Sequence, residues 1–441
     1  MATVTASASL DRAALLDRFA RMRRRTRALF DLLDDSVYYE RPIRLRNPVV
    51  FYQGHLPAFA VNTLIKKALG RPGIDEHLER IFARGIDPDS EAAASARGNP
   101  AWPSRHTVLD YAAEADRLIA HAIASGDLDR PGDPLLDRAQ ALWAVLEHEE
   151  MHQETMAYMW HELPYATKRA PAGYETLPLT QRGRRPGAAC VRIPAGVASL
   201  GTDPAATPFA WDNERPAHER PVDAFAIDVY NVTNDEFMEF VDAGGYHDPR
   251  WWSPEDREWL RAEGITHPRF WELAGDPGSE HWYWRGMFER VPLPAAWPVY
   301  VTWAEANAFA SWRGQRLPSE AEYHRAAVGA PSIGNFDFKR WDPEPVGWYS
   351  DAASDFGVED LVGNGWEWTS TPFGPFDGFV PLASYPEYSA EFFDGEHYVM
   401  KGASPLTAAP LVRRGFRNWF RPRYPYVYAT FRCVNGVRVQ P

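Results

Sequence analysis

Two histidines four residues apart are the feature of this sequence that most directly suggests chemistry. His148 and His152 stand in the run HEEMHQE, residues 148–154, inside a stretch from Leu135 to Glu162 that contains no Gly or Pro. This composition predicts one long helix, and residues four apart on a helix share a face. Two neutral imidazoles at this spacing commonly hold a divalent metal, which needs a further ligand from elsewhere in the chain.

Three histidines in the N-terminal part of the chain are candidates for this further ligand. His55 lies among apolar neighbours in the run FYQGHLP, residues 51–57, near the start of another expected helix. His106 precedes a helix in a polar loop, and His121 lies on a helix beside Ala and Ile. Helix bundles build metal sites on facing helices, which favours His55. A purely structural role stays open for each of the three.

The elements that must position these histidines are predicted to be helices. Apolar residues recur at three- and four-residue steps from Asp11 to Leu33, as in an amphipathic helix. A second helix is expected from Val49 or Val50 to Leu69, ended by Gly70. A third is expected from Thr107, as its cap, to Ser125. With the helix of the histidine pair, these predict a four-helix bundle at residues 1–164.

The rest of the chain has a different texture. Residues 165–187 carry helix breakers with little periodicity and are expected to be a linker. Residues 188–441 consist of short segments separated by Gly, Pro, Asn and Trp, with helices expected only at Thr233–Ala243 and Trp303–Trp312. The expected fold class is therefore α+β, with two domains joined by a linker.

Composition excludes several classes of protein. The 441 residues are too many for one typical core, and the net charge of −13 argues against a nucleic-acid partner. Cys190 and Cys433 make no disulfide framework, and no secretory signal precedes Asp11. No apolar run approaches the roughly 20 residues of a membrane span. We therefore expect a cytoplasmic protein with no nucleic-acid partner and no membrane partner.

Four segments of the C-terminal part resemble the sulfatase-modifying-factor family, which includes the formylglycine-generating enzyme. They are PVYVTW at 298–303, GQRLPSEAEY at 314–323, DLVGNGWEWT at 360–369 and FRCV at 431–434. The resemblance implies a loop-rich relative of the C-type lectin domain, with the Trp-Glu-Trp motif as scaffold. That enzyme binds copper through two cysteines. Only Cys433 occurs in these segments, so we do not expect copper chemistry here.

The N-terminal part resembles a DinB-like bundle, and the fusion of the two parts resembles the ergothioneine sulfoxide synthases. This resemblance implies Fe(II) bound by His55, His148 and His152. It further implies an O2-dependent enzyme that joins a thiol to C2 of the imidazole of hercynine, which is trimethylhistidine. Metal-bound histidines usually donate their second N–H to a carboxylate or carbonyl, for which Glu149 and Glu154 are candidates.

The resemblance also implies a hercynine site formed by Gln153, Asn418 and Trp419. A trimethylammonium group donates no hydrogen bond, so an aromatic face and amide oxygens suit it. Family members that use γ-glutamylcysteine carry an Asp after the Asn-Trp pair and an Arg four residues later. In this chain these positions are Phe420 and Tyr424.

Phe420 and Tyr424 would leave the charged ends of γ-glutamylcysteine unpaired. Aromatic walls suit a sugar ring better, and the selenoneine synthases are a branch of the family that accepts a 1-seleno- or 1-thio-sugar. We therefore expect a selenoneine synthase with a selenosugar donor. Four arginines keep a cysteine or γ-glutamylcysteine donor open as the alternative, namely Arg414, Arg417, Arg421 and Arg423.

A proton-transferring tyrosine follows the Trp-Glu-Trp motif in the family. The corresponding run here, residues 373–379, offers Phe376 instead. Tyr426 and Tyr428 are therefore the predicted catalytic hydroxyls, with Tyr38 and Tyr39 as further alternatives.

Two other functions compete with this prediction. The run from His148 to His152 also satisfies the H-E-x-x-H pattern of zinc hydrolases with Glu149 as general base, although no downstream third ligand follows. A binding module without catalysis is the other alternative, because both folds have non-enzymatic relatives.

Overall fold

The computed structural model describes residues 10–83, 101–175, 190–276 and 278–436. It divides into two units: one comprises the chain up to Arg169 with Leu382–Pro386, and the other comprises Ala170–Pro381 and the chain from Glu387 onward. Helices dominate the first unit and small sheets the second, so the fold is α+β. Of the linker expected at 165–187, residues 176–187 lie outside the described residues. Within the described ranges, no helix is long and apolar enough to cross a membrane.

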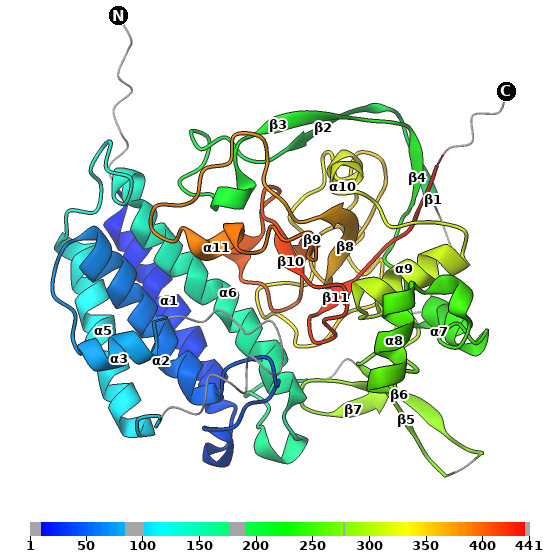
Figure 1. Ribbon diagram of the computed structural model, residues 1–441, viewed down its shortest axis with the longest axis horizontal. Helices are drawn as coiled ribbons and strands as arrows, with labels where there is room; N and C mark the ends of the chain where they lie inside the picture. The colour runs from blue at the N-terminus through cyan, green and yellow to red at the C-terminus, as the bar shows by residue number, and fades with distance from the viewer. Residues whose placement is uncertain (1–9, 84–100, 176–189, 277, 437–441) are drawn as a thin grey trace, which may run out of the picture. The chain divides into compact units, whose positions relative to one another are not determined.

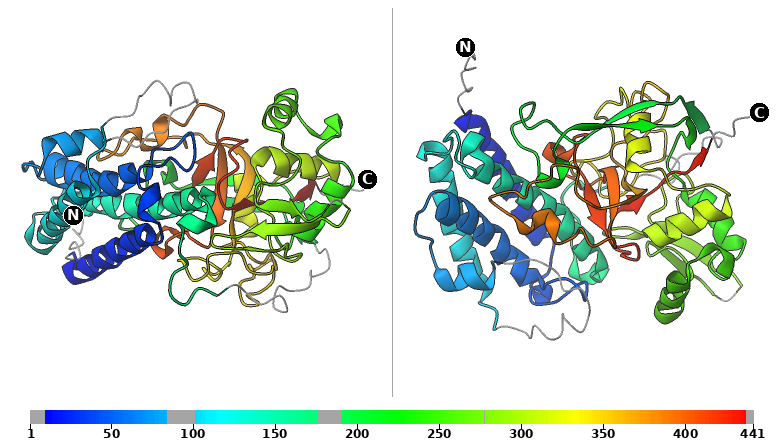
Figure 2. Two further views of the ribbon diagram at one scale, coloured as in Figure 1. Left: turned by 90° about the horizontal axis from the view of Figure 1, so that it is seen from below. Right: turned by 45° about the horizontal axis from the view of Figure 1, so that its top comes forward.

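The first unit is built from long helices that run alongside one another (Figure 1 and Figure 2). They are α1 (Arg12–Asp31), α2 (Val49–Ala60), α5 (Arg105–Ser125) and α6 (Gln140–Glu162), and the short helix α3 (Glu76–Ile81) contacts α2. α2 continues into the π-helical turns of η2 (Val61–Ala68), and Gly70 with φ of 63° ends it, as expected. Short 3-10 turns occur at Asp35–Val37, Asp137–Ala139 and Tyr165–Thr167.

Two helix starts differ from the sequence predictions. α5 is capped by Ser104, whose Oγ accepts the Thr107 backbone N–H at 3.1 Å, so Thr107 lies inside the helix. α6 begins at Gln140 rather than Leu135, because Arg138 and Ala139 adopt left-handed φ values of 52° and 59°. No Gly or Pro marks this break, so the residue types did not reveal it. The helix around the histidine pair is otherwise confirmed.

The second unit is a set of small sheets with short helices (Figure 1). Its largest sheet has the order β10-β9-β8-β11, with β8 (Gly365–Pro372), β9 (Tyr398–Ala403), β10 (Asn418–Phe420) and β11 (Ala429–Thr430). The other sheets contain β1 (Cys190–Ile193), β4 (Phe225–Asp228) and β12 (Val434–Gly436); β2 (Gly196–Leu200) and β3 (His218–Val222); and β5 (Trp271–Ala274), β6 (His281–Arg285) and β7 (Arg290–Pro292). The helices are α7 (Asn234–Asp242), α8 (Pro254–Glu263), α9 (Trp303–Trp312), α10 (Glu320–Ala326) and α11 (Glu387–Ala390), with 3-10 turns at Asp212–Glu214, Pro249–Trp251 and Ala409–Leu411.

The Trp-Glu-Trp motif forms part of β8 and is scaffold. Glu367 is fully buried and accepts hydrogen bonds of 2.6 and 2.7 Å from the buried guanidinium of Arg432. The Trp368 indole N–H donates to the Val301 carbonyl at 2.9 Å. β8 pairs with β9, and β9 pairs in turn with β10. This sheet therefore fixes the backbone of Asn418 and Trp419. The helices expected near Thr233 and at Trp303–Trp312 are confirmed as α7 and α9. The expectation of only two helices here was wrong, because α8, α10 and α11 also form, with Ser253 and Ser319 capping the first two.

Candidate metal centre and substrate residues

Three histidines of the first unit converge. His148 and His152 come from adjacent turns of α6 and His55 comes from α2, and one ligand nitrogen of each lies within 4.8 Å of the other two. The ring centroids of His148 and His152 are 4.2 Å apart. The His55 centroid is 5.1 Å from that of His148 and 5.2 Å from that of His152. This separation suits three ligands of one divalent metal.

The other two histidine candidates do not join this group. His106 has a side chain that is 86 % exposed and contacts Asp110 one turn later on α5. His121 contacts Ser125 on an exposed part of the same helix. The structure therefore brings His55, and neither competitor, to the histidine pair of α6.

Two backbone carbonyls orient the converging imidazoles. Nδ1 of His55 lies 2.7 Å from the Phe82 carbonyl oxygen, and Nδ1 of His152 lies 2.9 Å from that of His148. A carbonyl oxygen only accepts, so each Nδ1 carries the proton and each Nε2 keeps its lone pair for a metal. Glu149, one of the two carboxylates expected in this supporting role, binds Arg23 and Thr26 of α1 instead. The role of Glu154 stays a prediction.

Burial keeps all three imidazoles neutral. It lowers the pKa of His55 to about 4 and that of His152 to about 3. Burial, followed by the neighbouring His152 and His55, also holds the pKa of His148 well below its usual value. The neutral imidazole is the form that binds metal. Three neutral imidazoles, two buried and the third, His152, half-buried, fit a divalent metal such as Fe(II), and two of them have a fixed tautomer.

Aromatic side chains surround the three histidines. Phe59 stacks on His148 with centroids 3.6 Å apart, and Phe51 stacks on His55 with centroids 5.0 Å apart. The Tyr52 ring lies 6.1 Å from that of His152. These rings restrict rotation of the imidazoles and exclude water from their faces.

Tyr385 is a residue at this site that the sequence interpretation missed. It lies in Leu382–Pro386, the segment of the C-terminal half that belongs to the first unit. Its ring is 6.1 Å from that of His148 and 5.3 Å from that of Phe59. Phe376 instead lies in the second unit beside His218 and Arg417. The only signal for Tyr385 was its place in the loop after the Trp-Glu-Trp motif.

Gln153 is fully buried on the α1 side of α6. Its amide nitrogen donates to the Met22 carbonyl oxygen at 3.0 Å and to Thr26 Oγ1 at 3.1 Å. Its amide oxygen finds no donor in the part of the chain that the structure describes. A buried acceptor without a partner costs about 1–3 kcal/mol, so this oxygen has capacity for a ligand or water.

The predicted hercynine residues of the second unit lie together on β10. The Trp419 ring is stacked on Phe373 with centroids 4.2 Å apart and planes 5° apart, and Tyr388 and Phe392 flank it at 5.3 and 5.6 Å. Oδ1 of Asn418 accepts the Trp419 backbone N–H at 2.9 Å. One face of Trp419 is therefore covered by Phe373.

The predicted donor residues form an aromatic row. Phe420 and Tyr424 are stacked with centroids 5.0 Å apart, and Tyr426 meets Tyr424 edge-on at 5.1 Å. Tyr428 lies apart from this row, buried against Tyr300 and other rings. The structure thus brings Phe420, Tyr424 and Tyr426 together and leaves Tyr428 elsewhere in the unit.

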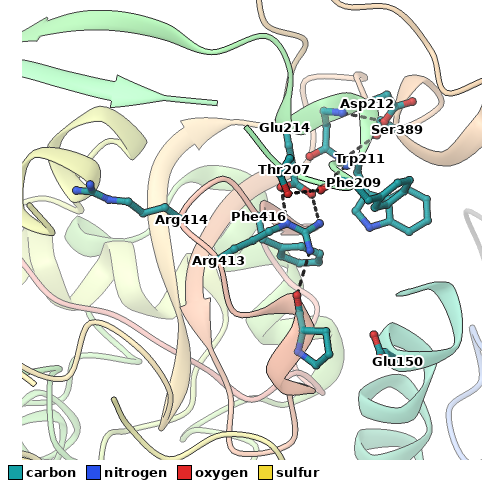
Figure 3. A network of polar contacts seen from close by, with 12 residues as sticks. Glu150, Thr207, Phe209, Trp211, Asp212, Glu214, Ser389, Arg413, Arg414 and Phe416 are labelled. Atoms are coloured by element: carbon teal, nitrogen blue, oxygen red, sulfur yellow. Dashed lines mark hydrogen bonds and ion pairs between the residues drawn. The ribbon is translucent and has the colours of Figure 1, made fainter. Parts of the chain in front are cut away.

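Each arginine that kept the charged donors open already has a partner in the second unit. Arg417 donates to Glu320 at 3.0 Å and Arg423 to Asp256 at 2.8 Å. Arg421 pairs with Glu396 and Asp394. Arg414 donates to the His324 carbonyl oxygen at 3.3 Å. Figure 3 shows Arg414 extending away from the neighbouring network, in which Glu214 binds Arg413.

Comparisons with known proteins agree with both units. Residues 176–437 match the sulfatase-modifying factor enzyme 1-like domain, and residues 18–156 match the DinB superfamily. The chain is 32 % identical to the hercynine oxygenase of Mycolicibacterium smegmatis over 96 % of this chain and 99 % of that relative. It is 33 % identical to the hercynine oxygenase of Mycolicibacterium thermoresistibile, over 96 % of this chain and 95 % of the relative. Ergothioneine biosynthesis protein 1 of Neurospora crassa is 26 % identical over 92 % of this chain and 56 % of its own length.

Proposed function

The chain belongs to the hercynine oxygenase family, and we propose that it is an Fe(II)- and O2-dependent enzyme that bonds selenium or sulfur to C2 of the hercynine imidazole. The observation that carries this proposal is the convergence of His55, His148 and His152 within 4.8 Å of one another. When bound, Fe(II) would supply redox chemistry with O2, and three protein nitrogens leave room for a donor atom and a substrate nitrogen.

The residues around the triad support this chemistry by holding protons and excluding water. The carbonyl oxygens of Phe82 and His148 hold the Nδ1 protons of two ligands and so direct the Nε2 lone pairs inward. Tyr385, whose ring lies near His148, is our candidate for the phenolic hydroxyl that moves a proton. Tyr426 and Tyr428 remain alternatives that the sequence predicts. We propose Gln153, Asn418 and Trp419 as residues that contact hercynine.

A selenosugar is the proposed donor. The stacked rings of Phe420 and Tyr424 offer apolar faces on which the C–H groups of a sugar can pack. The nearby arginines already have acidic partners: Arg417 pairs with Glu320, Arg421 with Asp394 and Glu396, and Arg423 with Asp256. A donor with two carboxylates would have to compete with these acidic partners. Ergothioneine sulfoxide synthesis from cysteine or γ-glutamylcysteine is the second candidate, because relatives over the full length carry the name hercynine oxygenase.

Anaerobic metal analysis followed by O2 uptake tests the proposal. Purified protein is expected to bind one equivalent of Fe(II), and O2 uptake with hercynine is expected to require a selenosugar or thiosugar. His55→Ala is expected to lose the metal, whereas the matched variant His121→Ala keeps it. Retention of iron by His55→Ala would remove His55 from the site. Efficient turnover of γ-glutamylcysteine or cysteine would replace the selenosugar donor by that thiol.

A further inference from the structure

Gly54 stands in the middle of α2, directly before His55, where a glycine is unfavourable. Glycine costs a helix roughly 1 kcal/mol relative to alanine, and every residue of α2 around it is buried. The backbone here is helical and needs no glycine-specific conformation. The reason for the glycine must therefore lie in what occupies the space of its missing side chain.

The ring of Phe82 occupies that space. A Cβ on Gly54 would lie 2.4 Å from both Cε2 and Cζ of Phe82, far inside van der Waals contact. Phe82 is fully buried and stacks on Trp102 with centroids 5.8 Å apart. It also contacts Phe51, the residue that stacks on His55. The ring therefore cannot retreat without moving Trp102 or Phe51.

Phe82 is also the residue whose carbonyl oxygen holds Nδ1 of His55 at 2.7 Å. It caps the C-terminus of α3, and α3 is held against η2 by the buried Glu79. Glu79 accepts a 2.8 Å bond from Lys66, and its carbonyl oxygen accepts one of 3.1 Å from Asn62. The orientation of His55 therefore depends on how closely α3 packs against α2.

We propose that Gly54 is a positioning residue for His55: the absent side chain admits the Phe82 ring, and this approach lets the Phe82 carbonyl fix the Nδ1–H tautomer of the third metal ligand. The proposal rests on the proposed metal role of His55. It predicts that Gly54→Ala pushes Phe82 away and frees His55. Because partners of metal ligands are typically worth about 10–100-fold in metal affinity, the affinity for Co(II) should fall by about that factor.

The experiment titrates metal-free protein with Co(II) and compares Gly54→Ala, Phe82→Leu and the double variant. Phe82→Leu removes Cε2 and Cζ, the two ring atoms closest to the added methyl group. The double variant is therefore expected to bind Co(II) more tightly than Gly54→Ala does. Gly70→Ala is the matched control: Gly70 has φ of 63° and a Cβ there meets nothing within 4 Å. It should lower stability by backbone strain and leave Co(II) affinity unchanged.

Nitrogen NMR of the His55 ring in metal-free protein supplies a readout that is independent of the metal. Wild type is expected to show the Nδ1–H tautomer, and Gly54→Ala a mixture of the two tautomers. Unchanged Co(II) affinity and tautomer in Gly54→Ala would overturn the proposal, as would an Nε2–H tautomer in wild type. If Gly54→Ala fails to fold, recovery of folding and Co(II) binding in the double variant supports the proposal, and failure of the double variant to bind contradicts it. If wild type shows the expected tautomer but binds no Co(II), the proposed function fails and the positioning of His55 stands.

Discussion

The carboxylate of Glu149 accepts a 2.8 Å hydrogen bond from the guanidinium of Arg23 on α1. Glu149 follows His148 directly, yet it faces a different helix from the one that carries His55. It also accepts a 2.5 Å bond from Thr26. A general base in a zinc hydrolase must face the metal-bound water. The H-E-x-x-H pattern is therefore present in the sequence without the arrangement that would make Glu149 a base.

Glu149→Gln is expected to lower the free energy of unfolding and leave the metal site intact. The substitution removes a buried charge partner of Arg23, which retains Asp116. Breaking one partner of a buried pair typically costs about 3–5 kcal/mol, and because Arg23 keeps Asp116 we expect a loss at the lower end of this range. Denaturant unfolding measures the loss, and Co(II) titration should show unchanged stoichiometry. An unchanged unfolding free energy together with lost catalysis would instead support a catalytic role for Glu149.

The histidine pair was predictable from sequence because its spacing is a local property of one helix. The third ligand, His55, was predicted from the bundle argument and the resemblance. The spacing of residues alone left His106 and His121 open, because the choice depends on which helices face each other. The direction of Glu149 likewise depends on Arg23 of α1, a residue far away in the chain. The break at Arg138 and Ala139 escaped prediction because residues without glycine's freedom adopt left-handed φ there.

Tyr385→Phe tests the proton-transfer role proposed for Tyr385, whose ring lies 6.1 Å from that of His148. Loss of a general acid or base typically costs about 10²–10⁴-fold in rate, so we expect kcat to fall by at least about 10²-fold. Metal content and the KM for hercynine should change little, because the ring that contacts Phe59 and His148 remains. Steady-state kinetics and metal analysis check both. If Tyr426→Phe or Tyr428→Phe shows this loss and Tyr385→Phe does not, the assignment belongs to that tyrosine.

No local signal indicated that Leu382–Pro386 belongs to the first unit. The Lys67 ammonium donates to the Ser384 carbonyl oxygen at 3.2 Å, and Tyr385 contacts Phe59. These contacts join residues that are more than 300 positions apart in sequence. Periodicity and motif spacing carry no information about such a contact, which explains why Tyr385 was missed.

Trp419→Leu is expected to weaken hercynine binding by roughly 2- to 30-fold, because a cation–π contact is worth about 0.5–2 kcal/mol. Leucine keeps an apolar side chain against Phe373, which covers one face of the indole. Calorimetric titration of hercynine measures the affinity. Phe373→Leu serves as the control, since it perturbs the stack but leaves the indole. Normal folding of Trp419→Leu with wild-type hercynine affinity would show that Trp419 does not bind the ammonium group.

Asp360→Asn is expected to stabilise the protein at neutral pH. Burial raises the pKa of Asp360 to about 6, so between pH 3.8 and pH 6 the folded state binds more protons than the unfolded state. The free energy of unfolding therefore falls as pH rises through this window, by about 2–3 kcal/mol in total. Asparagine can still accept the Gly347 N–H and tolerates the φ of 53° at this position. Unfolding curves between pH 4 and pH 7.5 should show that the free energy of unfolding of the variant increases relative to that of wild type as pH rises. If the two proteins showed the same change in unfolding free energy with pH, the prediction would be wrong.

The donor preference should change when charged groups replace the aromatic row. In Phe420→Asp/Tyr424→Arg the stacked pair, with centroids 5.0 Å apart, gives way to the Asp and Arg that the resemblance implies for a γ-glutamylcysteine site. An Arg fork binds a carboxylate bidentately. Each charged end that gains a partner is worth about 1–3 kcal/mol, so kcat/KM for γ-glutamylcysteine should rise by about 5- to 150-fold for each end that is paired.

The same double variant should lose activity with the selenosugar, because the apolar faces that would hold the sugar ring are gone. Phe420→Leu/Tyr424→Leu is the matched control, since it removes the rings without adding charge. This control should also lose activity with the selenosugar, and its activity with γ-glutamylcysteine should not increase. Competition assays with both donors at equal concentration, with hercynine, Fe(II) and O2 present, measure the ratio directly. Full selenosugar activity in the leucine variant would show that Phe420 and Tyr424 do not form the donor site.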